Sequence, residues 1–213
     1  MRTAHSVKMY VAIIGLALAF VSGGCAMAPK AERYVFPPLG SEYTASQSNT
    51  GSYGSGTSQY TSKITERMWE GKRVTAFASS TGTIIANADG SWSAMIGPDD
   101  KPIMSWDPPI MFDFPLEVGK TWTKSYRVTL HATKQTIPFD YSGKVEAYED
   151  VIVPAGTFKA FKISTSDTLG NENVIWYSPE LGVWVKSLMK RTAKYPAGPG
   201  TRESQVVSQT IRK

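Results

Sequence analysis

The chain has 213 residues, of which 41% are hydrophobic and 19% are charged. This composition excludes a wholly disordered chain, and the length suits one domain behind an exported leader. The net charge is +5, and two of the positive charges, Arg2 and Lys8, lie in an N-terminal stretch without acids. Such a weak charge, without a concentrated basic stripe, argues against a nucleic-acid partner.

The first 24 residues have the pattern of a secretion signal. A basic start is followed by the uncharged apolar run at residues 11–21, and then by the small residues Ser22, Gly23 and Gly24. The run is too short to cross a bilayer, which takes about 20 residues. A short apolar segment behind positive charges is what the export machinery recognises. We therefore predict a cleaved signal helix over residues 1–24.

Cys25 follows these small residues and is the only cysteine in the chain. The segment resembles the lipobox of bacterial lipoproteins, with Ser22 in place of the usual leucine. The resemblance implies that the leader is removed before Cys25, that its thiol carries lipid, and that no disulfide can form. Ala26 in place of aspartate implies, by the same resemblance, the outer membrane of a Gram-negative cell, with the protein facing the periplasm.

Residues 25–61 are rich in Ser, Thr, Gly and Asn and show no apolar period. A segment of this kind buries too little apolar surface to offset its ordering entropy. We predict a flexible, disordered tether between the lipid and the domain.

Residues 62–213 show the two-residue period of half-buried strands. Trp122, Tyr126 and Val128 alternate with polar residues, and similar runs cover residues 73–79, 83–88 and 203–211. Turn signals separate the runs, and no amphipathic helix of 12 residues is visible. We predict an all-β domain over residues 62–213, an antiparallel meander that forms a curved sheet, a sandwich or an open barrel. Prolines should break the ladder at residues 107–109.

Residues 151–158, with the sequence VIVPAGTF, form a predicted hairpin. The segment resembles the V-x-V-P-A-G-T-F hairpin of exported bacterial β-proteins of unassigned function, and residues 115–122 and 176–182 resemble other segments of those proteins. The resemblance implies a β-meander and no particular activity.

Catalytic patterns are weak in the predicted mature chain. His131 is its one histidine, so a zinc site of the usual Cys/His type cannot be built, and we expect no metal and no cofactor. Ser187 and Lys190 match an S-x-x-K pattern, but on a strand they would point to opposite faces. We interpret the acidic pairs at residues 99–100 and 149–150 as solvated turns.

Two surface features remain. Lys186, Lys190, Arg191 and Lys194 cluster in sequence; a solvated strand edge explains them, with an anionic surface or partner as the alternative. The six tryptophans are expected to fill the core. Trp106, beside the prolines, is the candidate for an exposed aromatic that contacts a ligand or a partner.

These observations favour a lipid-anchored envelope lipoprotein with a non-enzymatic β-domain that is structural or binds an envelope partner. One alternative is a carrier of a lipid or another apolar ligand, which predicts a cavity of at least about 300 Å³. A further alternative is an envelope hydrolase with two carboxylates about 5 to 9.5 Å apart across a cleft.

Overall fold

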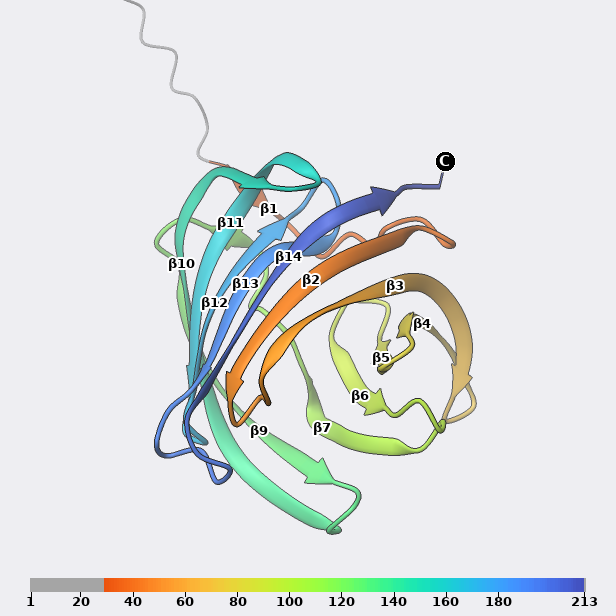
Figure 1. Ribbon diagram of the computed structural model, residues 1–213, viewed down its shortest axis with the longest axis vertical. Helices are drawn as coiled ribbons and strands as arrows, with labels where there is room; N and C mark the ends of the chain where they lie inside the picture. The colour runs from red at the N-terminus through yellow and green to blue at the C-terminus, as the bar shows by residue number, and fades with distance from the viewer. Residues whose placement is uncertain (1–28, 213) are drawn as a thin grey trace, which may run out of the picture.

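A computed structural model describes residues 29–212, and this part of the chain is built from antiparallel strands (Figure 1). The strands are β1 (Lys30–Ala31), β2 (Glu42–Gly51), β3 (Gly56–Trp69), β4 (Lys72–Ser79), β5 (Gly82–Ala86), β6 (Trp92–Ile96), β7 (Pro102–Ile110), β8 (Leu116–Glu117), β9 (Thr121–Leu130), β10 (Gln135–Val153), β11 (Gly156–Asp167), β12 (Asn171–Ser178), β13 (Val183–Arg191) and β14 (Gly200–Thr210).

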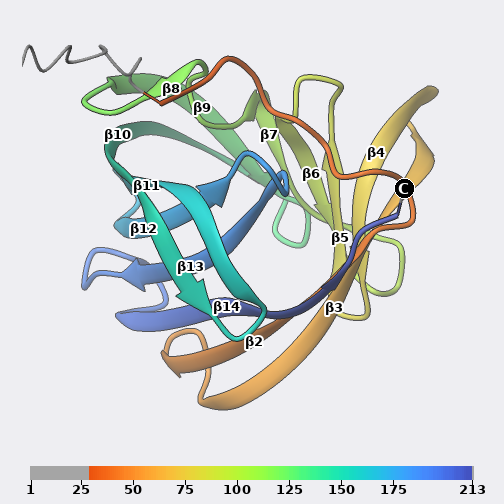
Figure 2. The ribbon, with the colours of Figure 1, turned by 90° about the horizontal axis from the view of Figure 1, so that it is seen from above.

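The sheet closes into a barrel, which Figure 2 shows from above as a ring of strands. Neighbours in sequence pair from β2 to β7 and from β9 to β14, β9 lies beside β7, and β2 lies beside β14 to complete the ring. The short strands β1 and β8 form a separate pair. Closure pairs every strand of the ring with two neighbours over part of its length, which limits edge-to-edge association of an all-β chain. The predicted all-β antiparallel class is confirmed, and the barrel is closed rather than open.

The prediction of a flexible tether is wrong for residues 29–61, because β2 and the start of β3 lie within that range. Tyr43 and Ala45 are buried inside the barrel, while Thr44 hydrogen-bonds Thr61 across the two strands at 2.9 Å. The stretch lacks an apolar period because its outer face meets solvent and part of its inner face is also polar. Threonine and tyrosine nevertheless favour a paired strand. Cys25 and the predicted leader lie outside the described residues.

Most predicted strands are present. Trp122, Tyr126 and Val128 are buried on one face of β9, and the VIVPAGTF segment forms the β10–β11 hairpin. The predicted break of the ladder at Asp107-Pro108-Pro109 is confirmed, although β7 itself runs on to Ile110, because neither proline has a ladder partner on β6 or β9. The β7–β9 ladder ends at the pair Asp107–Arg127, so the prolines, which lack an N–H, occupy positions without a partner on β9.

Residues 32–41 form a strap across one end of the barrel. The Tyr34 hydroxyl donates to the carbonyl of Gly182, and the Gly40 N–H donates to the carbonyl of Ile64. The strap, the β1–β8 pair, the β10–β11 hairpin tip and the C-terminus share this strap end, shown uppermost in Figure 1. The turns that follow β2, β11 and β13 lie at the opposite, far end.

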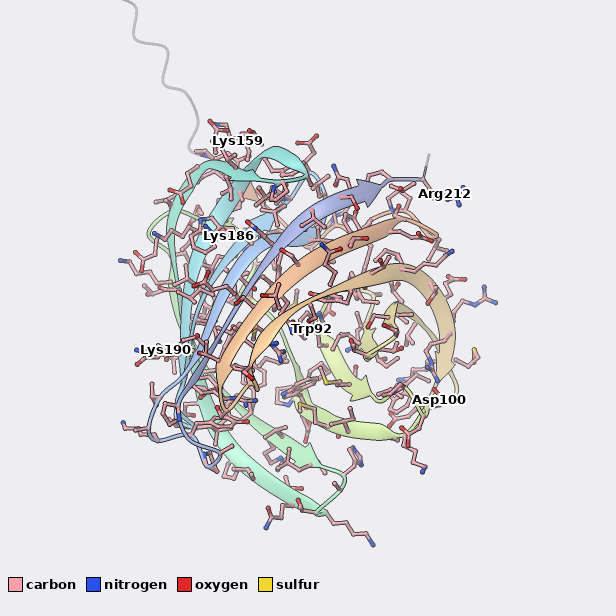
Figure 3. All side chains as sticks on the ribbon, viewed as in Figure 1. Trp92, Asp100, Lys159, Lys186, Lys190 and Arg212 are labelled. Atoms are coloured by element: carbon pink, nitrogen blue, oxygen red, sulfur yellow. The ribbon has the colours of Figure 1, made fainter. Side chains whose placement is uncertain are left out.

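The main apolar core lies beneath the strap. Its buried residues include Leu116, Phe161, Ile163 and Tyr177, and the rings of Tyr34 and Phe114 pack against them. Trp92 points into the barrel and stacks on Trp184 with 4.9 Å between ring centroids (Figure 3). The strap therefore closes an aromatic core, and it is part of the domain.

Candidate functional site

The structure places Trp106 on the inner face of β7, half-buried beside Tyr126 and Val128. Its proposed contact with a ligand or partner stays a prediction. A different tryptophan lies on the outer face. The Trp176 indole N–H donates to Glu149 at 2.8 Å, and the Lys186 ammonium lies 5.2 Å from its ring centroid.

The weak catalytic patterns do not assemble into a catalytic group. His131 is exposed, and its Nε2 lies 3.1 Å from the Ser105 hydroxyl. Ser187 is buried on the inner face of β13, whereas Lys190 is exposed and pairs with Glu172. The two ends of the S-x-x-K pattern thus point to opposite faces, as predicted.

The acidic pairs are occupied by neighbouring side chains. Asp100 binds Arg67 at 3.0 Å, and Asp150 binds Lys159 at 2.9 Å. Within residues 29–212, no three His, Cys, Asp or Glu side chains gather in a group that could hold a metal ion. No helix in the same range is long and apolar enough to cross a membrane.

A pocket of about 480 Å³ opens at the strap end, beside the prolines singled out in the sequence. Aromatic rings, prolines and a methionine form most of its wall, and charged side chains stand among them. The lining residues are Arg33, Tyr34, Ala88, Asp89, Ser91, Pro108, Pro109, Met111, Phe112, Asp113, Phe114, Lys124 and Tyr126. This combination of an apolar wall and a few charged groups suits an amphipathic ligand.

Tyr34 holds the strap against this pocket. Its ring stacks on Tyr177 with centroids 5.5 Å apart, and burial raises the pKa of its hydroxyl well above the usual range. Gly90 has a positive φ of 87° and lies against the same ring, where an added Cβ would come within 2.4 Å of it. The turn after β5 can therefore approach the strap only because it carries glycine there.

Asp113 organises the charges in the pocket. Its carboxylate pairs with Lys120 at 2.9 Å and with Lys124 at 2.5 Å. The hydrogen bond from Lys124 is the main cause that lowers the pKa of Asp113. Arg33, by contrast, is exposed and forms no ion pair with any residue from 29 to 212. The pocket thus carries one free cation beside an apolar wall.

A second hollow of about 600 Å³ lies over the outer face of the sheet from β9 to β13. Its charged residues already have partners, because Lys190 pairs with Glu172 and Lys144 pairs with Glu146. Val174 and Leu188 are its main aliphatic side chains. It is an open groove on the outer face whose charged groups are already paired, so we take the strap-end pocket, where Arg33 has no ion-pair partner among residues 29–212, as the better candidate for a ligand site.

Sequence reasoning missed Arg33 and Tyr34 because both fall in the predicted tether. Pro108 and Pro109 were noticed as an irregular segment, but not as part of a pocket wall. The apolar run at residues 34–36 was the available signal for Tyr34, since apolar side chains in a true linker have nothing to pack against.

The chain is similar to three solved bacterial structures. The first is a proposed lipoprotein from Parabacteroides distasonis, with 9% identity, a TM-score of 0.45, and coverage of 84% of this chain and 99% of the other. The second is a proposed exported protein with a YmcC-like fold from Bacteroides fragilis, with 16% identity, a TM-score of 0.44, and coverage of 84% and 99%. The third is the hypothetical lipoprotein YmcC from Escherichia coli, with 9% identity, a TM-score of 0.37, and coverage of 80% and 88%.

By their names, all three are exported proteins or lipoproteins. No family model matches the chain, and no curated protein matches it.

Proposed function

We propose that the chain is a lipid-anchored, non-enzymatic protein of the cell envelope whose barrel binds an amphipathic ligand in the strap-end pocket. The observation that carries the proposal is the position of the pocket: the strap residues Arg33 and Tyr34 that line it lie eight and nine residues after Cys25. The ligand site and the lipid anchor are therefore close neighbours along the chain.

The anchor would hold the barrel against the bilayer. Five residue steps separate Cys25 from Lys30 at the start of β1. An extended chain spans at most ~3.6 Å per residue, so these steps cover no more than ~18 Å. Lipid on Cys25 would thus bring the strap end to the membrane surface, in the outer membrane if Ala26 acts as the resemblance implies.

Exposed apolar side chains gather at the same end. Among the described residues, seven large hydrophobic side chains are exposed: Val35, Leu39, Met68, Ile103, Val118, Ile152 and Ile211. Five of them, all except Met68 and Ile103, lie on the strap, beside β8, at the β10–β11 tip or near the C-terminus. Ile152 at the hairpin tip is 79% exposed. Such side chains favour the boundary between headgroups and acyl chains over water.

The pocket has the size and chemistry for part of an acyl chain with an anionic head. Its volume of about 480 Å³ lies within the ~300–1,000 Å³ range of small-molecule sites. Phe112, Phe114 and Met111 offer apolar contact, and Arg33, which is exposed and has no ion pair among residues 29–212, offers a cation. We therefore favour an anionic amphiphile drawn from the adjacent membrane over a purely structural role.

The anchor is tested with Cys25→Ser in the full chain. The wild type should carry covalent lipid on a mature N-terminal cysteine and sediment with membranes, whereas the variant should carry none. Intact-mass measurement and membrane fractionation give the readout. Ala26→Asp is the matched control, because it should keep the lipid and move to the inner-membrane fraction. A Cys25→Ser chain with the wild-type mass and location would rule out the anchor.

The pocket is tested by native mass spectrometry of the wild-type chain extracted from membranes. We expect a non-covalent lipid mass in addition to the covalent anchor. Met111→Lys puts a charge at a half-buried position of the apolar wall and should reduce this occupancy at least ~10-fold, since the acyl chain could bind there only by removing that charge from water. Met68→Lys, at a residue 61% exposed and outside the pocket, should leave it unchanged. Equal occupancy in both variants would contradict the proposed site.

A further inference from the structure

Two arginines lie together inside the far end of the barrel. Arg191 ends β13, and Arg202 lies near the start of β14. Arg202 pairs in register with Met189 and Asn49, on the inner face that the buried Ser187 also occupies. The sequence suggested a solvated strand edge at Arg191, and that interpretation is wrong, because β13 is paired on both sides by β12 and β14.

Tyrosine rings hold the two guanidinium groups in place. The Arg191 guanidinium carbon lies 3.9 Å from the ring centroid of Tyr53 and 4.2 Å from that of Tyr195. The guanidinium carbon of Arg202 lies 4.6 Å from the Tyr53 centroid. Both cations therefore contact the ring of Tyr53, at distances where cation–π attraction operates.

Hydrogen bonds use only part of the donor set. Nη1 of Arg191 donates to the carbonyl of Ser52 at 2.8 Å, and Nε of Arg202 donates to Asn49 Oδ1 at 2.9 Å. The Nε of Arg191 is buried without a partner among residues 29–212. An arginine carries five N–H donors, so most donors of this pair are left for another acceptor.

No carboxylate neutralises the pair. Neither arginine forms an ion pair with an acid among residues 29–212, although eleven ion pairs join other side chains there. Burial lowers the pKa of Arg202, and the positive charge of Arg191 lowers it further. Two like charges, half-buried and close together, are unfavourable without an anion to offset them.

We infer that the Arg191–Arg202 pair binds a phosphate monoester, a dianion whose charge matches that of the pair. Planar guanidinium groups donate two parallel hydrogen bonds to phosphate oxygens, and the tyrosines limit the directions in which they can point. The inference is independent of the proposed lipid site, because the two sites occupy opposite ends of the barrel. A site at the far end faces away from the anchored end, which favours a soluble phosphorylated molecule over a lipid headgroup.

The outer lysines provide a matched control. Lys190 directly precedes Arg191 but lies on the outer face, where it pairs with Glu172 at 2.9 Å (Figure 3). Lys190→Gln removes a positive charge from the same strand without touching the arginine pair. If net charge alone governed binding, both Lys190→Gln and Arg202→Gln would weaken the affinity for a phosphorylated ligand. If the arginine pair forms a specific site, only Arg202→Gln weakens it.

The test uses the full chain and isothermal titration calorimetry at low salt, with glycerol 3-phosphate in solution as the first probe and vesicles that contain phosphatidic acid as the second. We expect the wild type and Lys190→Gln to bind glycerol 3-phosphate, and Arg202→Gln to bind at least ~30-fold more weakly, as for a charge-assisted bidentate contact. Binding to the vesicles alone would contradict a soluble ligand. No binding of either probe by the wild type would overturn the inference.

A second readout separates binding from a structural role. Without ligand, Arg202→Gln should change the melting temperature little, because the relief of repulsion from Arg191 offsets the loss of the contacts with Tyr53 and Asn49. With glycerol 3-phosphate, only the wild type and Lys190→Gln should gain thermal stability. Two results together would contradict the inference: an Arg202→Gln variant that melts well below the wild type without ligand, and a wild type that glycerol 3-phosphate does not stabilise. The arginines would then serve only to stabilise the far end of the barrel.

Discussion

A chain that lacks residues 30–61 is expected to lose its cooperative fold. The deletion removes β1, the strap, β2 and part of β3, so that β14 loses its partner and the barrel opens. It also removes the Tyr34 ring from the aromatic core. These losses should exceed the ~5–15 kcal/mol by which a domain is stable. Far-ultraviolet circular dichroism through a urea titration, and the dispersion of amide NMR signals, measure the outcome.

A flexible tether would predict the opposite result for this deletion. The shortened chain would then unfold cooperatively, with the midpoint of the full-length protein. Ser48→Ala is a control within the same segment, because Ser48 is exposed on β2 and its side chain makes no hydrogen bond within residues 29–212. It should change the free energy of unfolding by less than ~0.5 kcal/mol.

Gly143→Ala is expected to be among the most destabilising single substitutions. Gly143 pairs in register with Trp122 on the inner face, and an added Cβ would lie 2.1 Å from Cζ2 of that indole. Trp122 is buried against Phe112, with ring centroids 6.4 Å apart, so the indole has little freedom to move. Overpacking of this kind costs up to ~3 kcal/mol.

Chemical denaturation of Gly143→Ala beside Lys144→Ala measures this effect. Lys144 is the next residue on β10 and is exposed, and its one ion pair among residues 29–212 is with Glu146, so its removal should cost less than ~1 kcal/mol. Trp122→Leu combined with Gly143→Ala should recover part of the loss, because the smaller side chain makes room for the methyl group. A Gly143→Ala chain as stable as the Lys144→Ala chain would show that the indole relaxes without cost.

The strands that could be predicted are those with one apolar face and one polar face. In β9 the buried Trp122, Tyr126 and Val128 alternate with exposed residues, so the sequence carries the period directly. The β10–β11 hairpin was visible for another reason, because Pro154 and Gly156 mark a turn in any context.

The N-terminal strands were hidden because both of their faces carry polar residues. β2 places Gln47 and Asn49 inward toward Arg202 and Ser204, so the usual contrast between faces is absent. Its partner β14 lies about 150 residues away in sequence, and the pair Asn49–Arg202 cannot be inferred from local pattern. The long-range pairing that closes the barrel therefore stabilises β2, although its local sequence has no strand-like apolar pattern.

In the candidate sites, too, some residues could be noticed in the sequence and others only in the structure. Pro108 and Pro109, which line the strap-end pocket, were noticed in the sequence only as a break in the ladder, whereas Arg33 and Tyr34 were assigned to the tether. Arg191 was noticed as part of a basic cluster, but only the register separates it from Lys190, which faces outward on the same strand. Composition located the charges, and the strand pairing decides which of them face the interior.

Photo-crosslinking in intact membranes tests the central claim most directly. Cells or vesicles that contain the full chain are supplied with a fatty acid bearing a photoreactive group on its acyl chain, and the labelled peptides are mapped after illumination. The account predicts labels concentrated at residues 33–34 and 108–114, with Met111→Lys reducing them and Met68→Lys leaving them unchanged. Labels confined to the exposed side chains Val35 and Ile152, or an unlabelled protein, would contradict a ligand pocket at the anchored end.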